Sequence, residues 1–288
     1  MKKTVSLIIS VALIAISLLA FSSCGEKAKP TIGIIQFGSH ESLVNCYEGI
    51  ILGLRDSGID LNDYNVELLN SNFDPSVSQS QAKTLVNKGA KVIIAIATDI
   101  PNAEKQLEVV MAYMGKTDSL KIGVLYSTEE SSSPLQVANL KKAAEAVDSM
   151  NVTIVDKAVA DINTIDTAVN SLIDSGIDCF VNLLDNTIVG KLESNILPIT
   201  MEKKIPVFGS EVEQVKKGCV ASSSIDYKND VGMAAGKAAA EVLGGKNASD
   251  IPPVVVTNPQ VYINSAACEE LGLKLPENTL GAKDVSTH

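Results

Sequence analysis

The sequence predicts an α/β fold built on parallel β-sheet. Short apolar runs, typical of buried strands, alternate along almost the whole chain with segments whose apolar residues recur at spacings of three and four, as on one face of a helix. Residues that start helices follow several of these runs. A regular alternation of strand and helix indicates parallel pairing, because each helix carries the chain back to the starting edge of the sheet.

Each expected element follows from one such pattern, in chain order. The expected strands are residues 31–37, 66–69, 92–97, 122–126, 152–155, 179–184, 207–209 and 220–222. The expected helices are residues 41–57, 76–88, one that begins near Glu104, 134–150, 164–174, 187–203 and 229–243. Asp74, Ser133 and Asp226 are helix-start signals. Helix starts gather at the carboxyl ends of parallel strands, where α/β proteins bind ligands.

The N-terminal residues predict export and lipid attachment. Lys2 and Lys3 precede an uncharged, mostly apolar run over residues 5–21, which is followed by two serines and Cys24. This pattern is typical of a signal peptide over residues 1–23, and it fits cleavage better than the alternative of a short transmembrane helix. The residues before Cys24 resemble the lipobox of bacterial lipoproteins, which implies a lipid on this cysteine. Residues 24–30 are then the anchor and a polar linker.

Composition limits the functions that the chain can have. It has 24 basic and 34 acidic residues, a net charge of −10, and removal of Lys2 and Lys3 with the signal peptide gives −12. Nucleic acid is therefore not an expected partner. Besides Cys24 there are four cysteines without metal-ligand spacing, so no metal or cofactor is expected. Cys179 and Cys219 lie in or beside apolar runs and are interpreted as core residues, with disulfides as the alternative.

The sequence contains none of the common catalytic motifs, and its only histidines are His40 and His288. Polar residues instead follow nearly every expected strand. They are Gln36, His40, Thr98, Tyr126, Ser132, Ser133, residues 185–187, Ser210, Glu211, Asp226 and Tyr227. Taken singly, such residues are also those of ordinary turns and helix caps. Taken together, they predict a cleft for a polar ligand.

Several short motifs occur in an order that resembles one protein family. They are residues 34–36 with His40, 95–98, 104–108, 122–126, 185–187, 205–211 and 225–227. In this order, over almost all of residues 31–277, they resemble the ABC-transporter substrate-binding lipoproteins related to tryptophan- and tyrosine-binding proteins. The resemblance implies two Rossmann-like lobes of parallel sheet, of the type I periplasmic-binding-protein kind. Joined by a hinge, they would close on a small ligand and deliver it to a membrane permease.

The same resemblance implies lobe boundaries and site residues. The N-terminal lobe is expected over residues 31–102 and 226–250, and the C-terminal lobe over residues 103–225 and 251–288. The implied ligand-binding residues are Gln36, His40, Tyr126, Ser133, Asp185, Asn186, Thr187, Asp226 and Tyr227. Hydroxyls and helix-start N–H groups would suit the carboxylate of an amino acid, Asp226 or Asp185 its ammonium, and Phe37, Tyr126 or Tyr227 an aromatic side chain. Helix capping by Asp226 or His40 and core packing by Tyr126 remain alternatives.

One departure from the family pattern concerns the first lobe. In the family, the strand that ends in Ala-Ile-Ala-Thr is followed by more helix and strand before the chain crosses to the second lobe. Here only five steps separate Thr98 from Ala103, so at least one βα unit, roughly 30 residues or more, is missing. The first lobe is therefore expected to be shortened, with three strands and an uncovered edge.

The sequence thus predicts an exported, monomeric, membrane-anchored binding protein of an ABC importer. Its ligand would be an aromatic or other apolar amino acid. The first alternative is a ligand-sensing or degenerate binding lipoprotein without a transport role. The second is an enzyme that uses Asp185, Glu211 and Asp226 as its acid and base.

Overall fold

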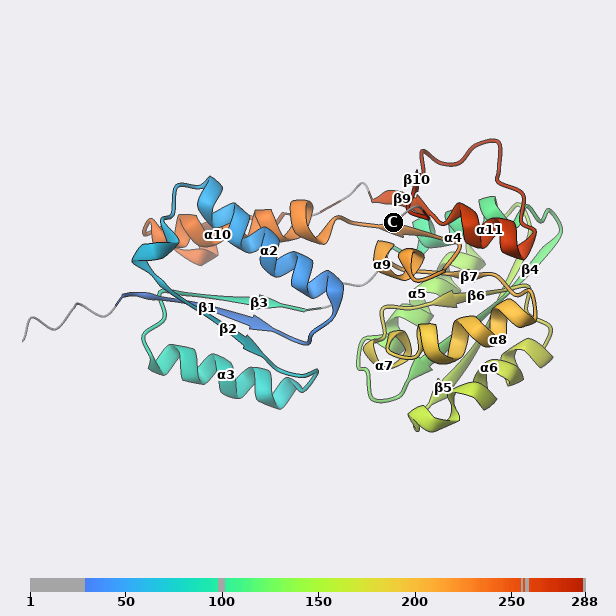
Figure 1. Cartoon of the computed structure of the whole chain (residues 1–288), viewed down its shortest axis with the longest axis horizontal. Coiled ribbons are helices and arrows are strands. Elements are labelled where there is room, and N and C mark those ends of the chain that lie inside the picture. The colour runs from blue at the N-terminus through green and yellow to red at the C-terminus, as the bar shows by residue number, and fades with distance from the viewer. Residues whose placement is uncertain (1–28, 98–101, 255, 257–258, 287–288) are drawn as a thin grey trace, which may run out of the picture.

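The computed structural model shows two α/β lobes that lie side by side (Figure 1). It describes residues 29–97, 102–254, 256 and 259–286. The expected signal peptide over residues 1–23 and the expected lipid anchor at Cys24 lie outside the described residues. Within the described part of the chain, no helix is long and apolar enough to cross a membrane.

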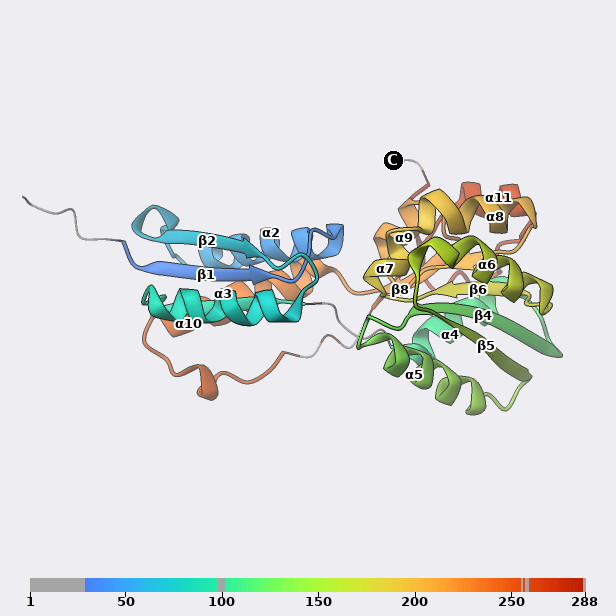
Figure 2. The same cartoon turned by 90° about the horizontal axis from the view of Figure 1, so that it is seen from below.

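The first lobe contains a three-stranded parallel sheet in the order β2-β1-β3. Its strands are β1 (Thr31–Gln36), β2 (Asn65–Asn70) and β3 (Val92–Ile96), and its main helices are α2 (Glu41–Asp56), α3 (Pro75–Asn87) and α10 (Met233–Leu243). Helices α2 and α10 cover one face of the sheet and α3 covers the other (Figures 1 and 2). The central strand β1 is consequently buried along its whole length, which explains its nearly continuous apolar sequence.

The second lobe contains a four-stranded parallel sheet in the order β5-β4-β6-β7. Its strands are β4 (Ser119–Ser127), β5 (Asn151–Val159), β6 (Cys179–Asn182) and β7 (Val207–Phe208), and its helices are α4 (Ala103–Met114), α5 (Ser133–Glu145), α6 (Ile165–Asp174), α7 (Asn186–Val189), the π-helix η3 (Leu192–Ile196), α8 (Leu197–Glu202) and α9 (Val212–Lys216). Alternation along β4 points Ile122 and Val124 toward the core beneath α4 and α5, and Leu125 toward the core beneath α6 and η3.

A third, smaller sheet in the order β10-β9-β8 belongs to the second lobe. It consists of β8 (Ala221–Ser224), β9 (Gln260–Ile263) and β10 (Lys283–Asp284), with helix α11 (Ser265–Leu271) after β9. β8 pairs with β9 in antiparallel orientation, so the fold is not parallel throughout. From β8 the chain returns to the first lobe through the π-helix η4 (Tyr227–Gly232), which continues into α10.

The α/β class, the parallel sheets and the two-lobe architecture are confirmed. Two expected helices are less regular than their patterns indicate. Residues 187–203 form α7, η3 and α8 in place of one helix, with a break at Gly190 and with Pro198 in the first turn of α8. Residues 229–243 begin as the π-helix η4. The short 3₁₀ turns η1 (Leu61–Asp63), η2 (Ile162–Thr164) and η5 (Ala248–Asp250) connect other elements.

The first lobe is small, as the short link after Thr98 implies. Among the described residues, no strand pairs with the outer edge of β3. A groove of about 690 Å³ lies there, between β3, helix α10, Ala248, residues 251–254 and Val256, and its walls are mainly Val, Ile, Ala and Pro side chains. The exact lobe boundaries expected from the sequence stay a prediction.

Candidate functional site

The two lobes meet where the loops that follow their parallel strands face each other. In Figure 1, β1 points toward the second lobe and β6 points toward the first. The register of the first sheet aligns Gln36 with Asn70 and with Ile96, so its strands end at the same level. Because helices begin at this edge of a parallel sheet, the junction gathers helix N-termini and the polar residues that precede them.

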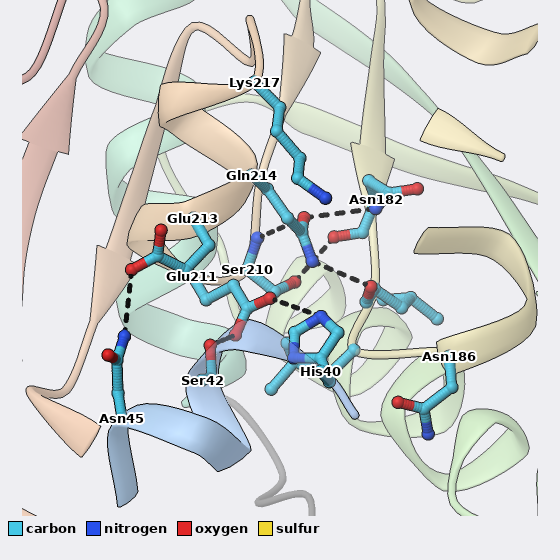
Figure 3. A network of polar contacts seen from close by, with 12 residues as sticks. His40, Ser42, Asn45, Asn182, Asn186, Ser210, Glu211, Glu213, Gln214 and Lys217 are labelled. Atoms are coloured by element: carbon cyan, nitrogen blue, oxygen red, sulfur yellow. Dashed lines mark hydrogen bonds and ion pairs between the residues drawn. The ribbon is translucent and has the colours of Figure 1, made fainter. Parts of the chain in front are cut away.

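His40 and Glu211 form the central contact between the lobes (Figure 3). Nε2 of His40 lies 3.1 Å from Oε1 of Glu211, and Ser42 donates a hydrogen bond from Oγ to Oε2 of the same carboxylate. Oε1 is fully buried, and His40 is its only partner among the described residues. The contact between His40 and Glu211 is therefore an ion pair when the ring is protonated.

The position of His40 follows from the start of helix α2. His40 is the N-cap residue, with an extended backbone (φ −101°, ψ 142°), but its side chain makes no capping hydrogen bond. The ring instead reaches toward the second lobe. No described residue accepts a hydrogen bond from the N–H groups of residues 41–43, so the positive end of this 16-residue helix is left uncapped at the junction.

The protonation of His40 is linked to this contact. Burial by itself lowers the pKa of the imidazole, but contact with the Glu211 carboxylate and its charge outweigh that effect, and the pKa is raised above its ordinary value of 6.5. Lys217 opposes the rise and Glu41 adds to it. The ring therefore stays protonated, and the interlobe ion pair persists, to a higher pH than for a histidine of ordinary pKa.

A second interlobe contact lies beside the first. Asn45 of α2 donates to Oε1 of Glu213 in α9 at 3.3 Å, and Lys216 forms an ion pair with the same carboxylate at 3.0 Å. Burial and the neighbouring Glu41 raise the pKa of Glu213, while Lys216 lowers it. Glu213 therefore binds the first lobe without facing the pocket described next.

A small pocket lies between the lobes. Its lining combines polar groups with an apolar wall: His40, Ser42, Leu43 and Tyr227 come from the first lobe, and Leu184, Asp185, Asn186, Val189 and Glu211 from the second. Its volume of about 10 Å³ is enough for one water molecule and far too small for an amino acid. A larger ligand can enter only if the lobes move apart.

Asp185 holds the second lobe's side of the pocket together. Its side chain is fully buried and its oxygens accept three hydrogen bonds, from the N–H of Ser127 (2.7 Å), Oγ of Ser133 (2.7 Å) and the N–H of Ile188 (3.0 Å). The carboxylate thus ties β4, α5 and α7 together and caps α7. All three donors belong to the protein, so the role of Asp185 in this structure is to position the loops around the pocket.

Asn186 is held by a residue that sequence analysis did not select. Both its backbone N–H and its Nδ2 donate to Oε2 of Glu130, at 3.2 and 3.1 Å. Burial raises the pKa of Glu130, and the charge of Asp185 adds to this. The side-chain oxygen of Asn186 has no hydrogen bond to a described residue.

A buried amide network supports the loop that carries Glu211. Oε1 of Gln214 accepts from Nδ2 of Asn182 and from the N–H of Ser210, both at 3.1 Å. Oγ of Ser210 donates to the carbonyl of Asn182 at 2.7 Å and accepts from Gln106 at 2.6 Å. These bonds join the ends of β6 and β7 to α4, and they hold in place the backbone that carries Glu211.

The remaining residues selected from the sequence do not line the pocket. Gln36 is buried at the end of β1 and donates to the carbonyl of Gly38, and Tyr126 packs against the core beneath α4 and α5. Asp226 accepts from the N–H groups of Lys228 and Asn229, which is the capping role given above as its alternative. Ser133 and Thr187 stand close by, on α5 and α7, and Ser133 supports Asp185.

The structure thus brings together His40, Asp185, Asn186 and Tyr227 and adds others. The additional lining residues are Ser42, Leu43, Leu184, Val189 and Glu211. Glu211 was visible as a polar residue after a strand, but nothing in the sequence gives it a partner in the other lobe. In the described part of the chain, no group of His, Cys, Asp or Glu side chains has the arrangement of a metal site.

Comparison with known proteins identifies the family. The model of the family described as ABC transporter substrate binding protein matches two overlapping stretches, residues 31–118 and 99–285. A tyrosine-binding protein of Clostridioides difficile (strain R20291) is 28% identical over 291 residues, an alignment that covers 86% of this chain and 83% of that protein. The alignment is longer than the part of this 288-residue chain that it covers, so some of its positions are gaps in this chain.

Solved structures show the same two-lobed fold. An ABC domain from Streptococcus pneumonia in complex with L-Trp has a TM-score of 0.76 and 27% identity, covering 89% of this chain and 99% of that one. A ligand-free, open substrate binding protein with adhesive properties from Clostridium difficile has a TM-score of 0.66 and 23% identity, covering 90% of this chain and all of that one. The family match covers nearly all described residues, and the chain belongs to the ABC transporter substrate-binding proteins, a family that works outside the cytoplasm with a membrane permease.

Proposed function

We propose that this protein is an exported, lipid-anchored receptor of an ABC importer that binds an aromatic amino acid between its two lobes. The observation that carries the proposal is the pocket between the lobes, which both lobes line and which combines charged groups with an apolar wall. Small-molecule sites have this mixture, because apolar surface supplies affinity and a few polar groups fix orientation.

The choice of ligand is supported by the relatives and by the lining of the pocket. One relative is a tyrosine-binding protein and another was solved with L-Trp. In this chain Leu43, Leu184, Val189 and the ring of Tyr227 offer an apolar surface, while His40, Ser42 and Glu211 offer groups for a charged backbone. This division suits an amino acid whose side chain is apolar or aromatic.

The mechanism that follows is closure of the two lobes on the ligand. His40, Ser42 and Asn45 of α2 reach Glu211 and Glu213 only when the lobes are together, and the pocket is then too small for a ligand to enter. Opening would break these contacts, and closure around a ligand would restore an interlobe surface that a permease can recognise. The lipid on Cys24 would keep this cycle next to the membrane.

A non-transport binding lipoprotein is the second candidate, and one observation favours it. The first lobe has only three strands in its described part and an open groove beside β3, so it presents less surface to a permease than a complete lobe would. An enzymatic function is not proposed, because the relatives of this protein are solute-binding proteins. In addition, the carboxylates of Asp185 and Asp226 are engaged as helix caps.

The test uses the chain from residue 25 onward, without the lipid. Its thermal unfolding is followed in the presence of L-tyrosine, L-tryptophan, L-phenylalanine and, as controls, acidic and basic amino acids. A ligand at one hundred times its Kd adds about 2.7 kcal/mol of stability, which is readily detected. Because the chain contains no tryptophan, binding of L-tryptophan can be followed by the fluorescence of the ligand itself. A folded protein that no aromatic amino acid stabilises would contradict the proposed ligand.

A further inference from the structure

The carboxylate of Glu211 is the feature of the pocket that most requires a ligand. Its side chain is 1% exposed, and the partners of its two oxygens, His40 and Ser42, both belong to the other lobe. A buried carboxylate without such partners is unfavourable unless a cation or donor completes its shell. In the described structure His40 provides the positive charge at 3.1 Å, and His40 belongs to the other lobe. When the lobes part, Glu211 loses both His40 and Ser42.

The N-terminus of α2 is a second feature of the same pocket. The helix has 16 residues, its N-cap side chain makes no capping bond, and the N–H groups of residues 41–43 donate to no described residue. Ser42 and Leu43 of this first turn line the pocket next to Glu211. An uncapped helix N-terminus favours an anion through its free N–H groups and its dipole.

These two features are adjacent and opposite in charge. Ser42 contacts Glu211 directly while standing in the first turn of α2, so an anion held by the helix start and a cation held by the carboxylate would lie side by side. We infer that Glu211 binds the α-ammonium group of the ligand and that the N-terminus of α2 binds its α-carboxylate. This inference rests on the function proposed above. It narrows the ligand to compounds that carry an ammonium group and a carboxylate on the same carbon atom.

The assignment replaces the two carboxylates that the sequence suggested for the ammonium group. Asp185 is fully buried and accepts three hydrogen bonds from its own lobe, so it keeps its partners when the lobes part, whereas Glu211 loses both of its partners. Asp226 caps η4 and does not line the pocket. The ligand's ammonium group takes the place beside Glu211 that His40 occupies in the described structure. The ligand's side chain then lies against Leu43, Leu184, Val189 and Tyr227.

The experiment compares ligands that lack one charged group each, using calorimetry on the chain from residue 25 onward. For the aromatic amino acid that binds, the probes are its analogue without the amine and its analogue without the carboxylate, such as 3-(4-hydroxyphenyl)propanoate and tyramine for L-tyrosine. The amino acid should bind at least about 30-fold more tightly than either analogue. An analogue without the amine that binds within about threefold of the amino acid would overturn the role of Glu211, and an equally tight amine without the carboxylate would overturn that of α2.

A pair of variants provides the second arm. Glu211→Gln keeps the shape but removes the charge, and the amino acid should then bind about 30-fold more weakly or worse. Asp178→Asn is the control, because Asp178 is a half-buried carboxylate that accepts a hydrogen bond from the N–H of Lys121 within the second lobe and neither lines the pocket nor contacts the first lobe; its effect should stay within about threefold. A cooperative unfolding transition without ligand establishes that each variant folds. The analogue series uses only the wild-type protein, so it tests the inference even if a variant fails to fold. Unchanged affinity in Glu211→Gln overturns the inference, whereas a wild type that binds no amino acid overturns the proposed function itself.

Discussion

Gly49 of α2 and Gly232 of η4 are in direct backbone contact. A Cβ atom on Gly49 would lie 2.8 Å from the α-carbon of Gly232 and 2.0 Å from the carbonyl oxygen of Lys228. One turn further along, a Cβ atom on Gly53 would lie 3.1 Å from the α-carbon of Gly236. Glycines four residues apart on both helices therefore let α2 and the η4–α10 segment approach with backbone against backbone. This contact holds the helix that carries His40 and Ser42.

The glycine contact leads to a prediction about stability. Gly49→Ala would place a methyl group against backbone atoms that cannot rotate away, so the free energy of unfolding should fall by about 3 kcal/mol. Gly244→Ala is the control, because its nearest neighbours lie at 3.4 Å and its φ of −74° suits alanine. The control should change stability by less than about 0.5 kcal/mol. Urea unfolding followed by circular dichroism measures both, and a Gly49→Ala variant as stable as wild type would show that the helices can separate.

His40 predicts a dependence of stability on pH. Its pKa is raised in the folded protein, so folding favours the protonated ring. The stabilisation is fully present below the unfolded pKa of about 6.5 and is lost as the pH rises through the higher folded pKa. The groups that set the size of the effect are Glu211, Glu41 and Lys217.

The measurement compares wild type with His40→Gln between acidic and alkaline pH. Wild type should be more stable by about 1 kcal/mol at pH values below about 6, the upper range for ion pairs that keep some solvent contact. The difference should shrink as the pH rises, because the neutral ring no longer attracts Glu211. A difference that stays constant with pH would show that His40 acts by packing alone.

Asp185 is predicted to matter for stability more than for binding. Asp185→Ala removes the acceptor of three buried donors and the cap of α7, so the free energy of unfolding should fall by about 3 kcal/mol. Asp161→Ala is a matched control, since Asp161 caps the exposed 3₁₀ turn η2 and should cost about 1 kcal/mol or less. Ligand affinity measured well below the unfolding temperature should fall far less in Asp185→Ala than in Glu211→Gln. The reverse order would contradict the assignment of the ammonium group to Glu211.

The sequence predicts the parts of this structure that depend on local pattern. The buried strand β1, the helix start at Asp74 and the capping role of Asp226 all follow from spacing and residue type within a few positions. The expectation that Ser133 caps its helix is wrong, because α5 already begins at Ser133 and the hydroxyl of Ser133 donates to Asp185. The contact between Ser42 and Glu211 joins residues 169 positions apart, and no local pattern predicts it. For the same reason the glycines of α2 and η4 are visible in the sequence while their pairing is not. The strand β9 was missed because its four residues follow Pro259, among prolines and turn residues.

The cysteines give the last prediction. Cys46, Cys179, Cys219 and Cys268 are free thiols and all are buried. Burial raises the pKa of Cys46 and of Cys268 to about 11, and it also raises the pKa of Cys179 and of Cys219. A thiol reacts as its thiolate, so at about pH 8 the folded chain from residue 25 onward should react with a thiol reagent at none of these sites. The same chain in concentrated guanidinium should react at all four. The control is Val86→Cys, at a position 64% exposed, which should react immediately in the folded state. Fewer reactive thiols after unfolding, with a matching loss of mass by two hydrogens per pair, would mean that disulfides form and that the folded chain differs from this structure around the bonded cysteines.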